Sequence, residues 1–293
     1  MKRISTLIYI AGISLWFSSL ALAVTPGEVR WHNEASDTTR INAILNEAMA
    51  MNDRQANEIM TFIGEKFIDT PYQAGTLEGS PETLTVNLDG MDCTTFVETV
   101  AALALTVSER RNSWQDFIYN LEQLRYRQGR LDGYASRLHY ISDWIVDNTH
   151  RGNLREVTDR MPGVKYQVKT LDYMSRHRDA YPALADDSAF DKIKNCEVGY
   201  RSHRFPYLRS SSLMGKKAPT WIKEGDVIAF TTKTEGLDVT HIGIVTIKNG
   251  EIHLLHASSK NGKVLSDPMP LAEYLRKNNN ITGARFIRIG AQR

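Results

Sequence analysis

The stretch DGMDCTTFVETVAALALTV, from Asp89 to Val107, decides the fold prediction because it joins a reactive side chain to a helix start. Apolar residues follow Cys93 at helical spacing: Phe96, Val97, Val100, Ala101 and Ala104. Asp92 stands where an N-cap side chain accepts a backbone N–H. We therefore predict a helix that begins at Cys93.

A cysteine at a helix N-terminus is suited to nucleophilic chemistry. The positive end of the helix dipole favours the thiolate and lowers a thiol pKa that is about 8.5 in free cysteine. Unpaired N–H groups of the first turn can also stabilise an oxyanion. The competing interpretation of Cys93 is a buried structural cysteine on a core helix.

Residues 1–23 have the pattern of a secretory signal, with Lys2 and Arg3, an apolar run, and Ala21 and Ala23 at the cleavage site. An uncleaved membrane anchor is the alternative, although the apolar run is short for a span. We expect the signal to be removed, leaving a periplasmic or secreted protein without stable membrane insertion.

The charge balance argues against a nucleic-acid partner. The formal charge of +2 includes two basic residues of the signal, so residues 24–293 are near neutral. A basic cluster from Tyr200 to Lys217 could still face an anionic substrate. The length of residues 24–293 allows one large domain, and we expect a monomer.

The chain has two cysteines, Cys93 and Cys196. In an oxidising compartment they could form a disulfide, which would make Cys93 structural. A chain of this length can build a core without such a bridge. The number of cysteines alone does not decide whether Cys93 is a free thiol or is bonded to Cys196.

The C-terminal third predicts strands, because DVIAF, HIGIVTI and IHLLHA are short apolar runs separated by turn residues. Asn249 and Gly250 predict a two-residue hairpin turn between the last two strands. Lys248 would then pair with Glu251. Elsewhere the periodicity predicts helices and one strand; residues 158–219 stay unassigned. The predicted helices are two within 37–67, one at 114–126 and one at 140–148, with a strand at 84–88.

The hairpin register brings two histidines to one face. Counting back from the turn makes His241 and His256 diagonal neighbours, about 7 to 8 Å apart, with Gly243 leaving room between them. This arrangement suits a base, His241, oriented by a polar partner, His256, beside the thiol of Cys93. A zinc site is the alternative, but further ligands are not evident. We expect no metal and no other cofactor.

Four segments in order, MDCTTFVE, IKEGDVIAF, THIGIV and LLHASS, resemble the NlpC-type branch of the papain-like cysteine peptidases that cut bacterial cell-wall peptides. PYQAGTLE and SRLHYISDWIVDN resemble more closely the N-acetylmuramoyl-L-alanine amidase-like subfamily. The resemblance covers about Thr61 to Val264. It implies an α+β fold with a papain-like core, in which the helix of the nucleophile packs on an antiparallel sheet. The core would span residues 61–108 and 220–290, and a large, mostly helical insertion would span about 109–219.

The resemblance implies a cysteine amidase that hydrolyses the bond between the lactyl group of muramic acid and L-alanine in muropeptides, through a thioester. It makes Cys93 the nucleophile, His241 the base and His256 the orienting residue. One alternative is a γ-D-glutamyl-diaminopimelate endopeptidase of the same fold. Another is a non-catalytic muropeptide-binding protein in which Cys93 is bonded to Cys196.

Five residues are the predicted substrate contacts: Tyr72, Asp92, Arg137, His139 and Tyr140. Tyr72 matches an upstream tyrosine that the family has near its nucleophile. In YASRLHYISDW, a cation and aromatic rings could bind a sugar or a peptide carboxylate. Tyr140 and Trp144 are at helical spacing and could equally be core residues.

Overall fold

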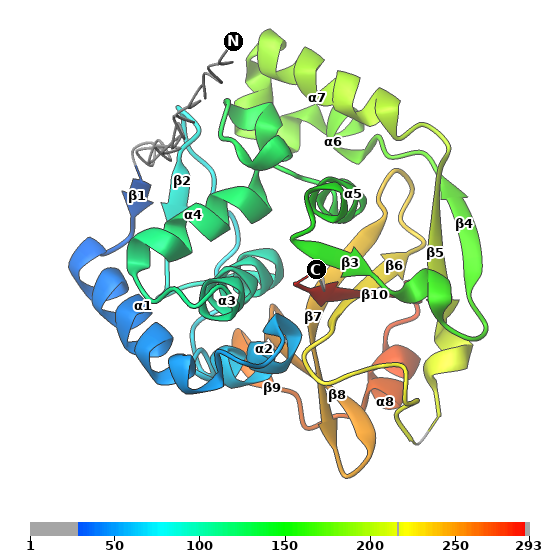
Figure 1. The fold of residues 1–293 in the computed structure, drawn as a ribbon. Coiled ribbons are helices and arrows are strands. Elements are labelled where there is room, and N and C mark those ends of the chain that lie inside the picture. The colour runs from blue at the N-terminus through cyan, green and yellow to red at the C-terminus, as the bar shows by residue number, and fades with distance from the viewer. Residues whose placement is uncertain (1–28, 216, 291–293) are drawn as a thin grey trace, which may run out of the picture.

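The computed structural model describes residues 29–215 and 217–290, so the predicted signal lies outside the described residues. Helices and an antiparallel sheet form a mixed α+β fold, as predicted (Figure 1). The helices are α1 (Glu34–Ala48), α2 (Ala56–Glu65), α3 (Cys93–Ser108), α4 (Trp114–Arg125), α5 (Ile141–Arg151), α6 (Tyr173–Arg176), α7 (Asp187–Gly199) and α8 (Leu271–Lys277). Within the described residues, every helix is too short or too polar to cross a membrane.

The strands divide into a small parallel pair and a large antiparallel sheet. They are β1 (Val29–Trp31), β2 (Leu84–Val86), β3 (Leu154–Glu156), β4 (Lys165–Lys169), β5 (His203–Arg209), β6 (Val227–Thr232), β7 (Val239–Lys248), β8 (Glu251–Ser258), β9 (Lys263–Ser266) and β10 (Ile281–Ile289). β1 pairs with β2, and the large sheet runs β4-β5-β10-β6-β7-β8-β9, with β3 also paired to β10.

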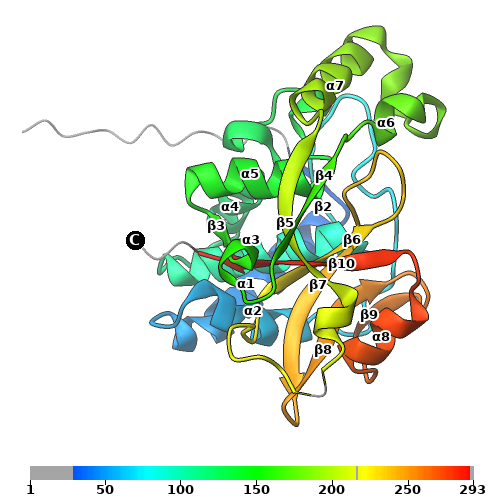
Figure 2. The same cartoon turned by 90° about the vertical axis from the view of Figure 1, so that its right-hand side faces the viewer.

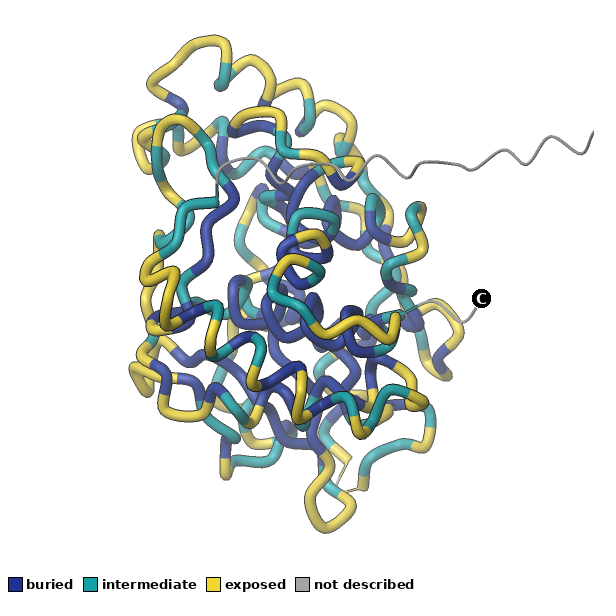
Figure 3. The backbone as a smooth tube through the Cα atoms, turned by 60° about the vertical axis from the view of Figure 1, so that its left-hand side comes forward, coloured by how far each residue is buried: buried dark blue, intermediate teal, exposed yellow. Residues whose placement is uncertain are grey.

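The central strands of the large sheet are buried on both faces, which explains why they are continuous apolar runs. Along β6, Val227 and Ala229 join a core with α2 and α3, whereas Ile228 and Phe230 join a second core with α8. In Figure 3 the buried residues gather along the central elements, and the exposed ones lie in the outer turns. The helix that begins at Cys93 therefore packs on the sheet from one side, against β7 and β8.

Helix α3 begins where the sequence predicts, and its cap explains why. The Asp92 carboxylate accepts the Thr95 N–H at 2.8 Å, while the Thr95 hydroxyl accepts the Asp92 N–H at 2.9 Å. This reciprocal capping box satisfies backbone groups that a helix start leaves unpaired. The cap fixes Cys93 as the first helical residue.

The segment at 109–219 is less purely helical than predicted. It holds α4 to α7, but it also supplies β3, β4 and β5 to the sheet. β4 and β5 form a ribbon beside β10 and run toward α6 and α7 (Figure 2). The side chains of β4 are exposed or half-buried and include charged residues, so the strand lacks the apolar alternation by which a strand is recognised.

Candidate active site

The hairpin of β7 and β8 has the predicted register, with Lys248 paired to Glu251. Asn249 and Gly250 both have positive φ, 52° and 79°, as the predicted two-residue turn requires. The strands therefore carry His241 and His256 to adjacent positions.

The two histidines are joined by a hydrogen bond of 2.7 Å between Nε2 of His241 and Nδ1 of His256. Gly243 makes this approach possible, because a Cβ at that position would lie only 3.0 Å from the Cβ of His256. A shift in the β6–β7 register between Phe230 and Thr231 places a bulge beside His241. Such bulges redirect side chains near functional sites.

Asp267, a residue not predicted from the sequence, continues this chain of contacts. Its Oδ2 lies 3.5 Å from Nε2 of His256, and both side chains are buried. Asp267 directly follows β9 and precedes Pro268, so the sequence gives only an Asp-Pro turn signal there. Its proximity to His256 depends on the pairing of β8 with β9.

Cys93 lies half-buried at the start of α3, against the backbone of β7. The N–H of Ile242, the neighbour of His241, favours the thiolate, as does the Thr94 hydroxyl. Burial opposes them and, with the Asp92 carboxylate, raises the pKa of the thiol to about 11. The predicted lowering of this pKa is thus wrong, because desolvation penalises the thiolate more than the helix start favours it.

His241 is also uncharged in the resting site. Burial, together with the nearby His256, lowers the pKa of its imidazole to about 3. The pKa of His256 is likewise lowered by burial, although Asp267 acts in the opposite direction. No hydrogen bond between described residues joins Cys93 directly to His241. The thiol of Cys93 and the imidazole of His241 are therefore both neutral in the resting site.

Two tyrosines flank this cluster. Tyr72 bridges to Met91 two residues before Cys93, and burial, Cys93 and Asp92 together raise the pKa of its hydroxyl. Tyr274 of α8 places its ring 6.5 Å from that of His241 and 6.0 Å from that of His256. Tyr72 was predicted, but Tyr274 was not, since nothing in its local sequence marks it.

The Asp92 carboxylate is directed at the first turn of α3. Its Oδ1 accepts both the N–H and the hydroxyl of Thr95, at 2.8 and 2.9 Å. Its carboxylate is thus occupied by the cap, and the predicted contact of Asp92 with a substrate stays a prediction.

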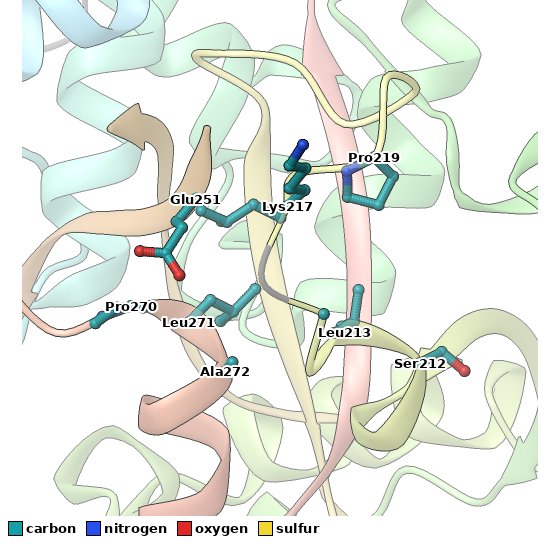
Figure 4. A pocket seen from close by; sticks show the side chains of 10 residues that line it. Ser212, Leu213, Lys217, Pro219, Glu251, Pro270, Leu271 and Ala272 are labelled. Carbon is teal, nitrogen blue, oxygen red and sulfur yellow. The ribbon is translucent and has the colours of Figure 1, made fainter. Parts of the chain in front are cut away.

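Two cavities lie outside this cluster. One lies between α8, the start of β8 and the segment before β6, where Lys217 and Glu251 are found (Figure 4). The other lies beside β1 and β2 and is lined by Trp31, Gln73 and Asn87 among others. In the described part of the chain, no three His, Cys, Asp or Glu side chains gather closely enough to hold a metal ion.

Residues 62–282 match the AmiA-like family, described as N-acetylmuramoyl-L-alanine amidase-like. The chain belongs to this family. An N-acetylmuramoyl-L-alanine amidase from Bacteroides uniformis is 41% identical, with a TM-score of 0.76 over 80% of this chain and 98% of that one. A Bacteroides fragilis protein, provisionally named a xylanase, is 43% identical, with a TM-score of 0.73 over 77% and 98% of the two chains.

A Legionella pneumophila protein shares the fold at 24% identity, with a TM-score of 0.64 over 88% of this chain and 97% of that one. The comparison with curated proteins gives no match. The predicted resemblance to the amidase-like subfamily is confirmed at the level of the family.

In this amidase-like protein, Arg137 lies in an internal charge network. Its guanidinium is buried, 2.8 Å from Glu78 and 3.4 Å from Glu82, and it stacks over the ring of Tyr134. These contacts join the segment before β2 to the inserted segment. The guanidinium of Arg137 is thus occupied by internal partners, and its predicted contact with a substrate stays a prediction.

His139 and Tyr140 also have internal partners. Nε2 of His139 lies 2.9 Å from the Tyr134 carbonyl oxygen, and burial with the nearby Arg137 lowers the pKa of His139 to about 3. The Tyr140 hydroxyl donates to Glu197 at 2.7 Å, within a separate core of the inserted segment. Both substrate contacts stay predictions, and Tyr140 has the core position that was its alternative.

The alternative disulfide is wrong, because Cys93 and Cys196 are both free thiols. Cys196 lies in α7, where its sulfur accepts a hydrogen bond from Arg127 at 3.5 Å. The structure thus leaves the Cys93 sulfur available for chemistry.

Proposed function

We propose that this protein is an amidase that cleaves the N-acetylmuramoyl-L-alanine bond of muropeptides, with Cys93 as the nucleophile. Membership of the amidase-like family supports the reaction and the peptidoglycan substrate. The observation that carries the cysteine mechanism is the 2.7 Å hydrogen bond that aligns His241 with His256 beside the start of α3.

Acylation begins from the neutral thiol. Because Nε2 of His241 is bonded to His256, its Nδ1 is the nitrogen left to accept a proton. Nδ1 takes the thiol proton as the sulfur attacks the lactyl carbonyl carbon, so that the unfavourable thiolate need not accumulate. When the tetrahedral intermediate collapses, the C–N bond breaks and the imidazolium protonates the amine of L-alanine. The peptide leaves, and a thioester remains on Cys93.

The start of α3 supplies groups for the oxyanion. Asp92 engages the N–H groups of Thr95 and Phe96, at 2.8 and 3.0 Å. This leaves the N–H groups of Cys93 and Thr94, at the first two helical positions, as the donors for a developing negative charge. The capping box holds them in place before substrate binds.

Deacylation reverses the roles. His241 accepts a proton from a water molecule as the water oxygen attacks the thioester carbonyl. Collapse breaks the C–S bond, releases the lactyl carboxylic acid of the sugar, and returns the proton to the sulfur. The site regains the neutral pair in which it began.

The name xylanase of one relative does not fit this site. Glycosidases use two carboxyl groups on either side of the scissile bond. Here the residues joined by a short contact are two imidazoles; of the nearby carboxylates, Asp92 caps α3 and Asp267 lies behind His256. Nucleophilic acyl transfer suits these residues, and glycoside hydrolysis does not.

The proposal also places the protein in the periplasm or outside the cell. Its support is the signal-like pattern of residues 1–23, which includes a basic start, an apolar run and a small-residue cleavage site. Peptidoglycan fragments are found there.

Product analysis tests the proposed reaction. A defined disaccharide-peptide is digested with the protein, and the products are identified by mass spectrometry. We expect a sugar that keeps its lactyl carboxylate and an intact peptide with L-alanine at its N-terminus. A sugar that still carries L-alanine and D-glutamate would instead identify the γ-D-glutamyl-diaminopimelate endopeptidase.

A further inference from the structure

We propose that Asp267 is a positioning residue that acts through His256 to keep Nδ1 of His241 free as the base. The inference rests on the proposed function and adds a fourth member to the chain of Cys93, His241 and His256. The proposed role of Asp267 is to determine which ring nitrogen carries the proton in His256 and in His241.

Asp267 is fixed at three points besides His256. Its Oδ1 accepts the Met269 N–H at 2.9 Å, and its own N–H donates to the Leu254 carbonyl at 2.7 Å. Its carbonyl oxygen lies 3.0 Å from Nδ1 of His253. These contacts hold the carboxylate, which is only 7% exposed, with Oδ2 directed at His256.

Among the described residues, Nε2 of His256 has no other partner. This nitrogen is buried and lacks a hydrogen bond of ordinary length, and the Asp267 carboxylate at 3.5 Å is the group that faces it. An unpaired buried polar group is costly, so a proton on this nitrogen that points to the carboxylate is the favourable state.

The positions of the protons then follow along the chain. A carboxylate only accepts, so His256 carries its proton on Nε2 and its Nδ1 is an acceptor. His241 must therefore donate through Nε2 in the 2.7 Å bond. A neutral imidazole has one N–H, so Nδ1 of His241 keeps its lone pair for the thiol.

Substitution of Asp267 by Asn should move the proton of each imidazole from Nε2 to Nδ1. The Met269 N–H would hold the amide oxygen where Oδ1 now lies, which places the NH₂ group at the position of Oδ2. That group donates to Nε2 of His256, so His256 would carry its proton on Nδ1. His241 would then accept through Nε2 and carry its proton on Nδ1, where the base must be free.

Asp267→Ala should have a smaller effect than Asp267→Asn, because alanine forms no hydrogen bond with Nε2 of His256 and so favours neither protonated form of the ring. The productive form stays accessible to the histidine pair, although it is no longer favoured. We expect kcat on a defined muropeptide to fall about 100-fold for Asp267→Asn and about 10-fold for Asp267→Ala, with KM changed little. A purely structural role predicts the opposite order, since Asn matches the shape of Asp and Ala leaves a void.

The test measures kcat and KM for both variants, with Glu273→Gln as a control. Glu273 is an exposed residue of α8 whose side chain pairs with Lys277, so its loss of charge should leave kcat unchanged. Asp267→Asn with kcat equal to or above that of Asp267→Ala would overturn the proposal.

Nitrogen-15 NMR of the histidine rings reads the protons without any substrate. We expect the proton on Nε2 of both His241 and His256 in the wild type, and on Nδ1 of both in Asp267→Asn. A wild-type His256 protonated on Nδ1 would overturn the inference, even if the amidase activity is present. The expected NMR result without amidase activity would leave the inference standing and remove the proposed function.

Discussion

The Cys93 cluster and the segment from Arg137 to Tyr140 make an instructive pair. Each contains a half-buried histidine whose pKa is lowered to about 3, His241 in the first and His139 in the second. His139 contacts a backbone carbonyl beside a buried guanidinium that two carboxylates hold in place. His241 contacts a second imidazole through Nε2, and Cys93 at the start of α3 is a free thiol.

The two regions differ in whether their polar groups already have hydrogen-bond or ion-pair partners. The guanidinium of Arg137 is already paired, so binding a substrate there would require breaking buried ion pairs. In the Cys93 cluster, the bond to His256 leaves Nδ1 of His241 without a hydrogen-bond partner among the described residues, and Cys93 is a free thiol. Residue types that could do chemistry are thus functional only where the fold leaves them available.

The largest expected effect separates the two cysteines. We expect Cys93→Ala to lower peptide release from a muropeptide about 10³-fold or more, because it removes the nucleophile. Cys196→Ala is the matched control and should stay within about twofold of wild type, since its sulfur contacts only Arg127 among the hydrogen bonds of the described residues. Equal losses in both variants would show that thiol chemistry at Cys93 is not the reason.

The next effect concerns stability at Arg137. Arg137→Met leaves Glu82 buried without its cation, and we expect the free energy of unfolding to fall by about 3 kcal/mol in denaturant titrations. Lys277→Met breaks an exposed, solvent-screened pair and should leave the free energy of unfolding almost unchanged. A variant that kept its stability but lost affinity for the muropeptide would favour the substrate contact predicted for Arg137.

His241 and His139 should both make the stability of the protein depend on pH. Their folded pKa of about 3 lies below the ordinary 6.5, so the unfolded chain binds more protons between these values and stability falls as pH falls. Each can contribute up to about 1.4 kcal/mol per pH unit. We expect His139→Gln and His241→Gln both to flatten the pH dependence of the melting temperature, measured from pH 4 to 7 by calorimetry.

Only His241→Gln should also abolish hydrolysis. His139→Gln should keep kcat/KM within about twofold, because glutamine can still donate to the Tyr134 carbonyl. If His139→Gln removed activity from a stable protein, the distinction between the two regions would fail.

Local signals predicted much of the candidate site. The cap at Asp92, the spacing after Cys93 and the Asn249-Gly250 turn each act over a few residues, so α3 and the histidine register could be read from the sequence. Asp267 and Tyr274 could not, because their place beside His256 depends on how β9 and α8 pack. The pKa of Cys93 was missed for the same reason, since burial is a property of the whole fold.

The inserted segment was harder to predict than the core. Its strands β4 and β5 expose much of their surface, so they lack the apolar alternation that marks half-buried strands. Arg137 was selected for its charge, and the sequence could not reveal that Glu78 and Glu82 would pair with it. Distant pairing of charges leaves no local pattern.

The smallest expected effect concerns Asp92. Asp92→Asn keeps an efficient N-cap but removes a charge that raises the thiol pKa of Cys93. We expect alkylation of Cys93 by iodoacetamide at pH 8 to be about two- to fivefold faster than in wild type, with unfolding free energy changed by less than about 0.5 kcal/mol. An unchanged rate would mean that Asp92 does not influence the sulfur.

The formation of a thioester on Cys93 is tested most directly by hydroxylamine during muropeptide hydrolysis. Hydroxylamine competes with water for a thioester, so the account predicts a sugar product with a hydroxamate on its lactyl carbonyl. The yield should rise with hydroxylamine concentration for wild type and be absent for Cys93→Ala. If wild type released the peptide at its usual rate and gave only the free carboxylate at every concentration, the result would contradict an acyl-enzyme.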